Sequence, residues 1–147
     1  MRNTARFSLG NISDFNPNKD RVSVDTLWEI DRWALHTTQK LVQRVRQGYE
    51  EFAFHLIFHE VNRFCTVDLS SLYLDILKDR LYTFPKTSPG RRAAQTTLFE
   101  IITTLTRLIA PVLSFTADEI WSEIPSWDKK EAPVHLSSFP TIEGNDW

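Results

Sequence analysis

His55 and His59 lie one helical turn apart, with Glu60 beside the second histidine and Cys65 five residues further on. Metal ligands on helices use this i, i+4 spacing. The zincin arrangement HExxH is absent, however, and a structural zinc site needs four convergent ligands. We therefore predict no metal site here, and we expect His59 to pair with Arg63 or with a carboxylate.

Cys65 is the single cysteine of the chain, so no intrachain disulfide can form. It ends an apolar stretch, where a small buried hydrophobic role is expected rather than that of a nucleophile. The sequence contains no nucleophile elbow, phosphate loop or glycine-rich dinucleotide turn. The neighbouring carboxylates Asp118 and Glu119 suit the positive end of a helix dipole. We predict no catalytic residue and no cofactor site in this chain.

A second set of residues has the chemistry to contact nucleic acid. Basic side chains recur on two predicted helices, and tryptophans that can stack on bases lie near them. The members are Arg2, Arg6, Lys40, Arg44 and Arg46, with Trp28 and Trp33 as aromatic neighbours. The alternative is a solvated helix surface with ordinary ion pairs, which is the commoner meaning of charges on helices. The residues alone leave both interpretations open.

The composition indicates a globular domain without strong overall charge. The 147 residues carry a net charge of −2, and 41% of them are hydrophobic, which is too many for a disordered chain. Seven acidic and two basic residues lie from Phe115 onward, so the rest is mildly positive. No signal peptide pattern opens the chain and no apolar run reaches membrane-spanning length. We expect a cytoplasmic protein that is not a general binder of polyanions.

Capping residues and apolar periodicity predict helices along most of the chain. One covers residues 1–11 with no cap before it, which suggests a cut from a longer protein, and another covers 25–47 with Gly48 as its stop. A helix over 49–65 and one capped by Asp68 follow. Ser88 caps the next helix, which Pro111 ends, and a capping box of Thr116 and Glu119 opens the last.

Apolar spacing predicts which faces of these helices are buried. The long helix after Ser88 carries a stripe of Leu98, Ile101, Ile102, Leu105, Leu108, Ile109 and Val112. The 49–65 helix is apolar over Phe52, Phe54, Leu56, Ile57, Phe58, Val61 and Phe64, which predicts a place in the middle of a bundle. After Asp68, the inward residues should be Leu72, Tyr73, Ile76 and Leu77. Hydrophobic staples are expected between Val67 and Leu72, and between Phe115 and Ile120.

Together these elements predict an all-α fold. We expect an up-and-down bundle of about five or six helices over residues 1–124. Prolines interrupt the pattern after Trp121, so residues 125–147 should form an extended tail packed on the bundle.

Five pieces of sequence, in order, resemble a known family. They are RNTARFSLGNISDF (2–15), YEEFAFH (49–55), DLSSLYLDILKDRLY (68–82), RRAAQT (91–96) and APVLSFTADEIW (110–121). The chain resembles the anticodon-binding domain of class I aminoacyl-tRNA synthetases, with DLSSLYLDILKDRLY pointing to the bacterial-type isoleucyl branch. It departs at Ser8, where an aliphatic residue is usual, and at Asp118, where Glu is usual.

The resemblance implies a parent enzyme that charges tRNA with isoleucine and uses ATP. Its catalytic domain would carry HIGH and KMSKS motifs, and a cysteine-rich zinc module follows in some bacterial relatives. None of these is present here. The resemblance therefore implies an excised domain that does not aminoacylate alone and that partners the catalytic domain of its parent chain.

The implied role is to dock the anticodon stem-loop of isoleucine tRNA, with no membrane involved. Charge and placement make Arg2, Asn3, Arg6, Lys40, Arg44 and Arg46 the candidate contacts, with Trp33 as a stacking residue. The alternatives are the same domain of a valyl or leucyl enzyme, and a helical protein-interaction scaffold that binds no RNA.

Overall fold

The computed structural model describes residues 1–141, and no strand occurs among them. The elements are α1 (Arg2–Ile12), α2 (Glu29–Glu50), α3 (Phe54–Arg63), a π-helical segment (Phe64–Tyr73), α4 (Leu74–Thr83), α5 (Pro89–Ile109) and α6 (Ser114–Glu123). Short 3₁₀ turns lie at Val24–Thr26 and Val134–Leu136. The predicted all-α fold is confirmed. The part of the predicted tail over 142–147 lies outside the described residues.

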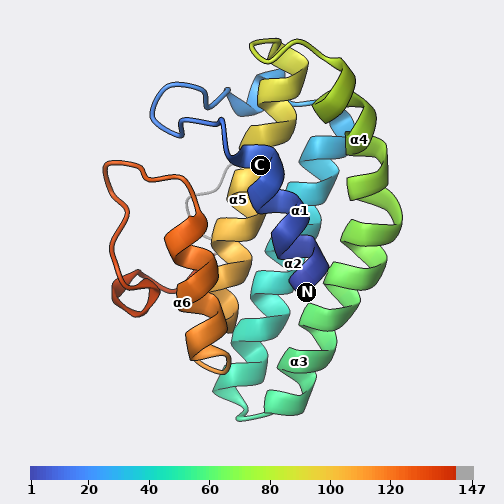
Figure 1. The fold of residues 1–147 in the computed structure, drawn as a ribbon. Helices are drawn as coiled ribbons and strands as arrows, with labels where there is room; N and C mark the ends of the chain where they lie inside the picture. The colour runs from blue at the N-terminus through green and yellow to red at the C-terminus, as the bar shows by residue number, and fades with distance from the viewer. Residues whose placement is uncertain (142–147) are drawn as a thin grey trace.

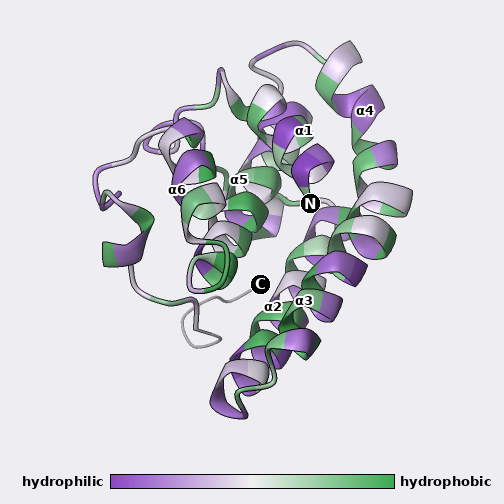
Figure 2. Cartoon of the chain, turned by 60° about the horizontal axis from the view of Figure 1, so that its bottom comes forward, coloured by the Kyte–Doolittle hydropathy of each residue, from purple (hydrophilic) through white to green (hydrophobic). Residues whose placement is uncertain are grey.

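Successive helices run in opposite directions, as Figure 1 shows. α1 runs up, α2 down, α3 and α4 up, α5 down and α6 up, while α4 and α6 lie on opposite sides of the molecule. The helix α5 is the centre of the bundle, since it contacts α1, α2, α4 and α6. Its hydrophobic residues stand out in Figure 2.

The predicted core stripe of α5 is confirmed except at its end. Leu98, Ile101, Ile102, Leu105, Leu108 and Ile109 are at most 2% exposed. Val112 is 42% exposed, because the helix ends at Ile109 before Pro111 and the chain turns away.

The helix predicted to start at Asp68 does not start there. α3, the π-helical segment and α4 form one continuous helix from Phe54 to Thr83, and Asp68 lies inside it. Hydrogen bonds of the i→i+5 type carry the backbone through this stretch, as when the Leu74 amide donates to the Leu69 carbonyl. No free amide therefore remains for Asp68 to cap, and the Val67–Leu72 staple does not form, since both side chains are exposed.

The predicted burial of the helix over 49–65 and of the residues after Asp68 is confirmed for one set of side chains and wrong for another. Ile57, Val61 and Phe64 are buried, and so are Tyr73 and Leu77. The outer faces remain in solvent, because this continuous helix packs at the edge of the bundle rather than in its middle. The apolar side chains left exposed there are Phe52, Phe54, Leu56, Phe58, Leu72 and Ile76.

The helix predicted over residues 25–47 corresponds to α2, but both of its predicted ends are wrong. The helix begins at Glu29 rather than Asp25, which belongs to a 3₁₀ turn. It continues through Gly48 to Glu50. Gly48 is buried, and a Cβ added there would lie 2.8 Å from Cγ1 of Ile57. The glycine is therefore needed for the close approach of α3 rather than as a stop.

The capping box predicted for the last helix is wrong. α6 begins at Ser114, and its first turn closes when the Ala117 amide donates to the Leu113 carbonyl at 2.8 Å. Thr116 therefore lies within the helix. Phe115 is 94% exposed, which rules out the hydrophobic staple.

We expect the two predicted caps to differ in their effect on stability. Ser88→Ala should lower the free energy of unfolding by about 1 kcal/mol, because the Arg91 amide donates to the Ser88 hydroxyl at 3.3 Å. Thr116→Ala should change it by less than about 0.5 kcal/mol, as for surface positions without a cap. Urea unfolding followed by circular dichroism measures both. Equal losses at the two sites would mean that Thr116 caps α6 after all.

A buried ion pair joins α2 to α4. Both terminal nitrogens of Arg80 donate to the Asp31 carboxylate at 2.8 Å, and the two side chains are at most 3% exposed. The Tyr73 hydroxyl donates to the same carboxylate at 2.8 Å, and burial, together with this carboxylate, raises the tyrosine's pKa. The guanidinium also donates to the Gly90 carbonyl and lies 4.0 Å from the ring centroid of Trp28. Arg80 thus lies in the interior, at 3% exposure, rather than on the solvent-facing side of α4.

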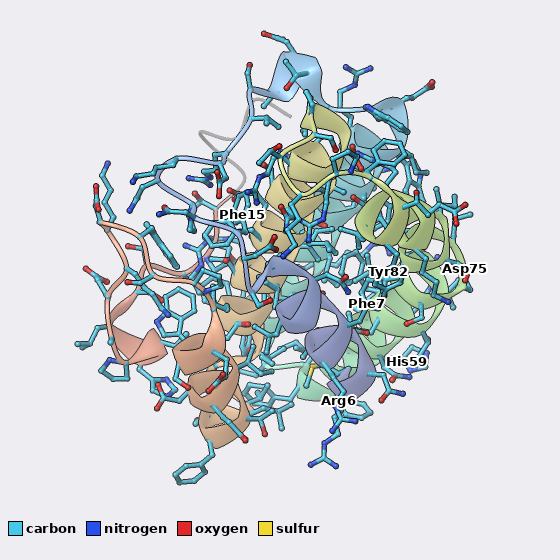
Figure 3. All side chains as sticks on the ribbon, turned by 45° about the horizontal axis from the view of Figure 1, so that its top comes forward. Arg6, Phe7, Phe15, His59, Asp75 and Tyr82 are labelled. Atoms are coloured by element: carbon cyan, nitrogen blue, oxygen red, sulfur yellow. The ribbon has the colours of Figure 1, made fainter. Side chains whose placement is uncertain are left out.

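A second ion pair joins α5 to the link after α1. Arg91 donates to both carboxylate oxygens of Asp14, at 2.9 and 3.1 Å, and these hydrogen bonds lower the pKa of that carboxyl. Gln95 donates to Asp14 and to the Asn11 carbonyl. Phe15, which Figure 3 labels, packs on Phe99 of α5 with ring centroids 5.7 Å apart. These contacts fix α1 against the centre of the bundle.

Candidate nucleic-acid interface

The seven predicted contact residues do not form one site. One groove is lined by Trp33, Lys40 and Arg44, and a second groove by Arg2 and Arg6. Asn3 is exposed on α1, the helix that also carries Arg2 and Arg6. Arg46 contacts the C-terminal tail. The three places differ in their charge and in their access to solvent, so they are described separately.

The exposed face of α2 carries a stripe of basic residues. Arg32, His36, Lys40 and Arg44 follow one another at i, i+4 spacing, and all four are exposed. No acidic residue occurs between positions 32 and 49. Arg32 and His36 were not among the predicted contacts, although their spacing in the sequence is visible without a structure. The stripe gives α2 a positive outer surface along most of its length.

A groove of about 230 Å³ runs beside this stripe, between α2 and the helix formed by α3 and the π-helical segment. Its α2 wall includes Trp33, Lys40 and Arg44, and Arg63 stands on the opposite wall. Arg63 was missed as a contact because only packing brings it opposite α2. The groove thus offers three cations and a half-buried indole.

Two carboxylates also line this groove, Glu60 and Asp68. Nη1 of Arg44 donates to Oε2 of Glu60 at 2.9 Å, with the arginine side chain 50% exposed and the glutamate 28% exposed. The expected pairing of His59 with Arg63 or a carboxylate is not among the hydrogen bonds and ion pairs of the described residues, and Figure 3 places His59 on the outer helix. Arg44 is thus reachable from solvent but already has an acidic partner.

Arg2 and Arg6 occupy a different environment. They line a groove of about 570 Å³ between α1 and α6, together with Glu119 and Glu123. These carboxylates face the same space as the arginines and would repel a phosphate there. The groove beside α2 also holds two carboxylates, but it has three basic side chains against two here, so it is the better phosphate site of the two.

Arg46 is held by the tail that follows α6. Its Nη1 donates to the Pro140 carbonyl at 3.1 Å, and its guanidinium lies 5.9 Å from the ring centroid of Phe139. These two contacts hold its guanidinium against the tail. The Arg80 guanidinium lies on one face of the Trp28 ring, although the side chain as a whole is 45% exposed.

The histidine, cysteine and acidic side chains are scattered over residues 1–141. No group of three or more His, Cys, Asp and Glu side chains there could hold a metal ion. Cys65 is fully buried, as predicted, and burial raises the pKa of its thiol. None of the helices described is both long and apolar enough to cross a membrane.

Comparison with known proteins adds to this geometry. Residues 31–147 match the family described as the anticodon-binding domain of tRNA ligase. Similar proteins include the isoleucine–tRNA ligases of Moorella thermoacetica, Syntrophotalea carbinolica and Desulfitobacterium hafniense, with 48%, 52% and 56% identity over 143, 139 and 125 residues. These matches cover 97%, 95% and 85% of this chain but only 14–15% of the relatives.

The family match covers most of the bundle, including the basic stripe of α2 and its groove. This family match agrees with the resemblance carried by the five sequence pieces and with the all-helical up-and-down fold. The chain therefore belongs to the family of anticodon-binding domains of tRNA ligases.

Proposed function

We propose that this chain is the anticodon-binding domain of an isoleucine–tRNA ligase and that it binds the anticodon stem-loop of isoleucine tRNA along α2. The observation that carries the proposal is the groove that joins Trp33, Lys40, Arg44 and Arg63 beside the basic stripe. The names of the relatives support isoleucine over valine or leucine.

The groove suits two kinds of contact with RNA. The exposed cations of α2 neutralise backbone phosphates, which positions the RNA without reading its sequence. Trp33 is half-buried and lines the groove, so its exposed part can stack on an unstacked loop base. Both walls belong to long packed helices, so the backbone positions that carry these side chains are set before RNA binds.

The chemistry of aminoacylation is assigned to the rest of a parent chain. The chain spans about 15% of the length of its relatives, so ATP, any zinc and the catalytic domain belong to the remainder. We propose that residues 1–147 alone do not aminoacylate tRNA, that their partners are tRNA and that catalytic domain, and that the parent acts in the cytoplasm.

We expect Lys40→Gln and Arg44→Gln each to weaken binding of an isoleucine anticodon stem-loop. Each change should also lower the slope of log affinity against log salt by roughly one unit or slightly less, because one phosphate contact is lost. The wild-type dissociation constant should lie near ~10⁻⁴–10⁻⁶ M at physiological salt, since acceptor-stem contacts are missing. Fluorescence anisotropy with a labelled stem-loop measures both quantities.

The matched control is Lys78→Gln on α4, which removes the same charge from an exposed pair with Asp75 away from the groove. Figure 3 shows Asp75 on the outer side of that helix. If Lys78→Gln weakens binding as much as Lys40→Gln, the RNA does not lie along α2. If the wild type does not prefer the isoleucine loop to a scrambled loop, the assignment to anticodon recognition is wrong.

A further inference from the structure

Glu60 holds the position that a ligand of Arg44 would take. Its carboxylate comes from α3 and reaches across the groove to accept a hydrogen bond from the Arg44 guanidinium at 2.9 Å. Lys40 and Arg63 line the same groove, together with a second carboxylate, Asp68. The carboxylate therefore lies where the positive charges of the two helices converge.

Carboxylate and phosphate present the same kind of oxygen acceptor to a guanidinium. The pair of Arg44 and Glu60 is solvent-exposed on the arginine side, and exposed pairs of this kind contribute little to stability. A polyanion that enters the groove can thus replace the carboxylate at little cost to the fold. Glu60 cannot remain in place next to a phosphate without repulsion.

We propose that the Glu60 carboxylate occupies the site of an RNA backbone phosphate and competes with it for Arg44. This inference rests on the proposed function, because it takes RNA as the ligand of the groove. It assigns to Glu60 the role of a positioning residue that orients Arg44 before binding and limits the affinity of the site. The contact concerns the backbone, so it acts on every RNA that enters the groove.

The test compares wild type, Glu60→Gln and Asp75→Asn in binding to the isoleucine anticodon stem-loop and to a scrambled-loop control. Glu60→Gln removes the charge but keeps an oxygen acceptor for Arg44. It should tighten the binding of both RNAs by about threefold to tenfold, which is the scale of one unit charge acting over about 4 Å in bulk water. Asp75→Asn removes the same charge from a pair on α4 and should change affinity by less than about twofold.

A double-mutant cycle shows whether Glu60 acts through Arg44. In the Arg44→Gln background, the gain from Glu60→Gln should fall to less than half of its value in the wild type. The urea midpoint of Glu60→Gln should stay close to that of the wild type, which separates the effect on RNA from an effect on folding. If Glu60→Gln increases RNA affinity by the same factor in the Arg44→Gln background, then Glu60 and the phosphate do not compete for Arg44, and the proposal is wrong.

The outcomes also separate this inference from the proposed function. If the wild type prefers the isoleucine loop but Glu60→Gln binds no tighter than Asp75→Asn, the phosphate site is wrong and the function stands. If Glu60→Gln tightens both RNAs but the wild type does not distinguish the loops, the phosphate site stands and anticodon recognition fails. If none of the variants binds RNA at low salt, both are wrong.

Discussion

Arg80→Met lowers the free energy of unfolding by about 3–5 kcal/mol, the largest single effect that we expect in this chain. The change leaves the Asp31 carboxylate buried without the two hydrogen bonds that it receives from the guanidinium. It also removes the cation from the ring of Trp28 and a donor from the Gly90 carbonyl. Chemical unfolding in urea at neutral pH measures the loss.

Two further variants show that the loss comes from the uncompensated charge. Lys78→Met, two residues earlier on α4, breaks an exposed pair with Asp75 and should cost less than about 1 kcal/mol. The double variant of Asp31→Leu with Arg80→Met removes both charges and should regain part of the loss. A cost for Arg80→Met no larger than that of Lys78→Met would show that Asp31 tolerates burial without this partner.

Leu105→Ala should lower the free energy of unfolding by about 2–5 kcal/mol, because it opens a cavity in the centre of the bundle. Leu105 is 1% exposed and lies on α5, which contacts four other helices. Its control is Val112→Ala, a truncation at a 42% exposed position just after the helix, where we expect less than about 1 kcal/mol. Differential scanning calorimetry gives both values. Equal costs would mean that the core does not follow the α5 stripe.

The fold was predictable where local signals agree. The stripe of α5 and its Ser88 cap depend on residues within a few turns of one another, and both are confirmed. The π-helical segment was not predictable, because Asp68 in front of an apolar run is also a good helix start. At Gly48, the glycine is typical of a helix end, and only the nearness of Ile57 shows its other role.

Part of the candidate site was also predictable, because that part depends on residues that lie close together in the sequence. Lys40, Arg44 and Trp33 belong to one helix, so their common face follows from periodicity, and Arg32 and His36 could have been added from spacing alone. The approach of α3 was not readable from the sequence, so Arg63 and the pairing of Arg44 with Glu60 were missed. Outside the site, the buried ion pair of Arg80 with Asp31 was not predicted either, because the two residues lie 49 positions apart in the sequence.

The separation of charge along the chain gives the molecule an electric dipole. The stripe of α2 is basic, whereas α6 and the stretch up to Glu131 carry five acidic and two basic residues, with α5 between the two regions (Figure 2). The net charge of −2 alone would slow the approach of a polyanion. For an RNA that binds along α2 as proposed, this dipole would turn the α2 side toward the RNA during diffusion, so the association rate should depend on orientation as well as on ionic strength.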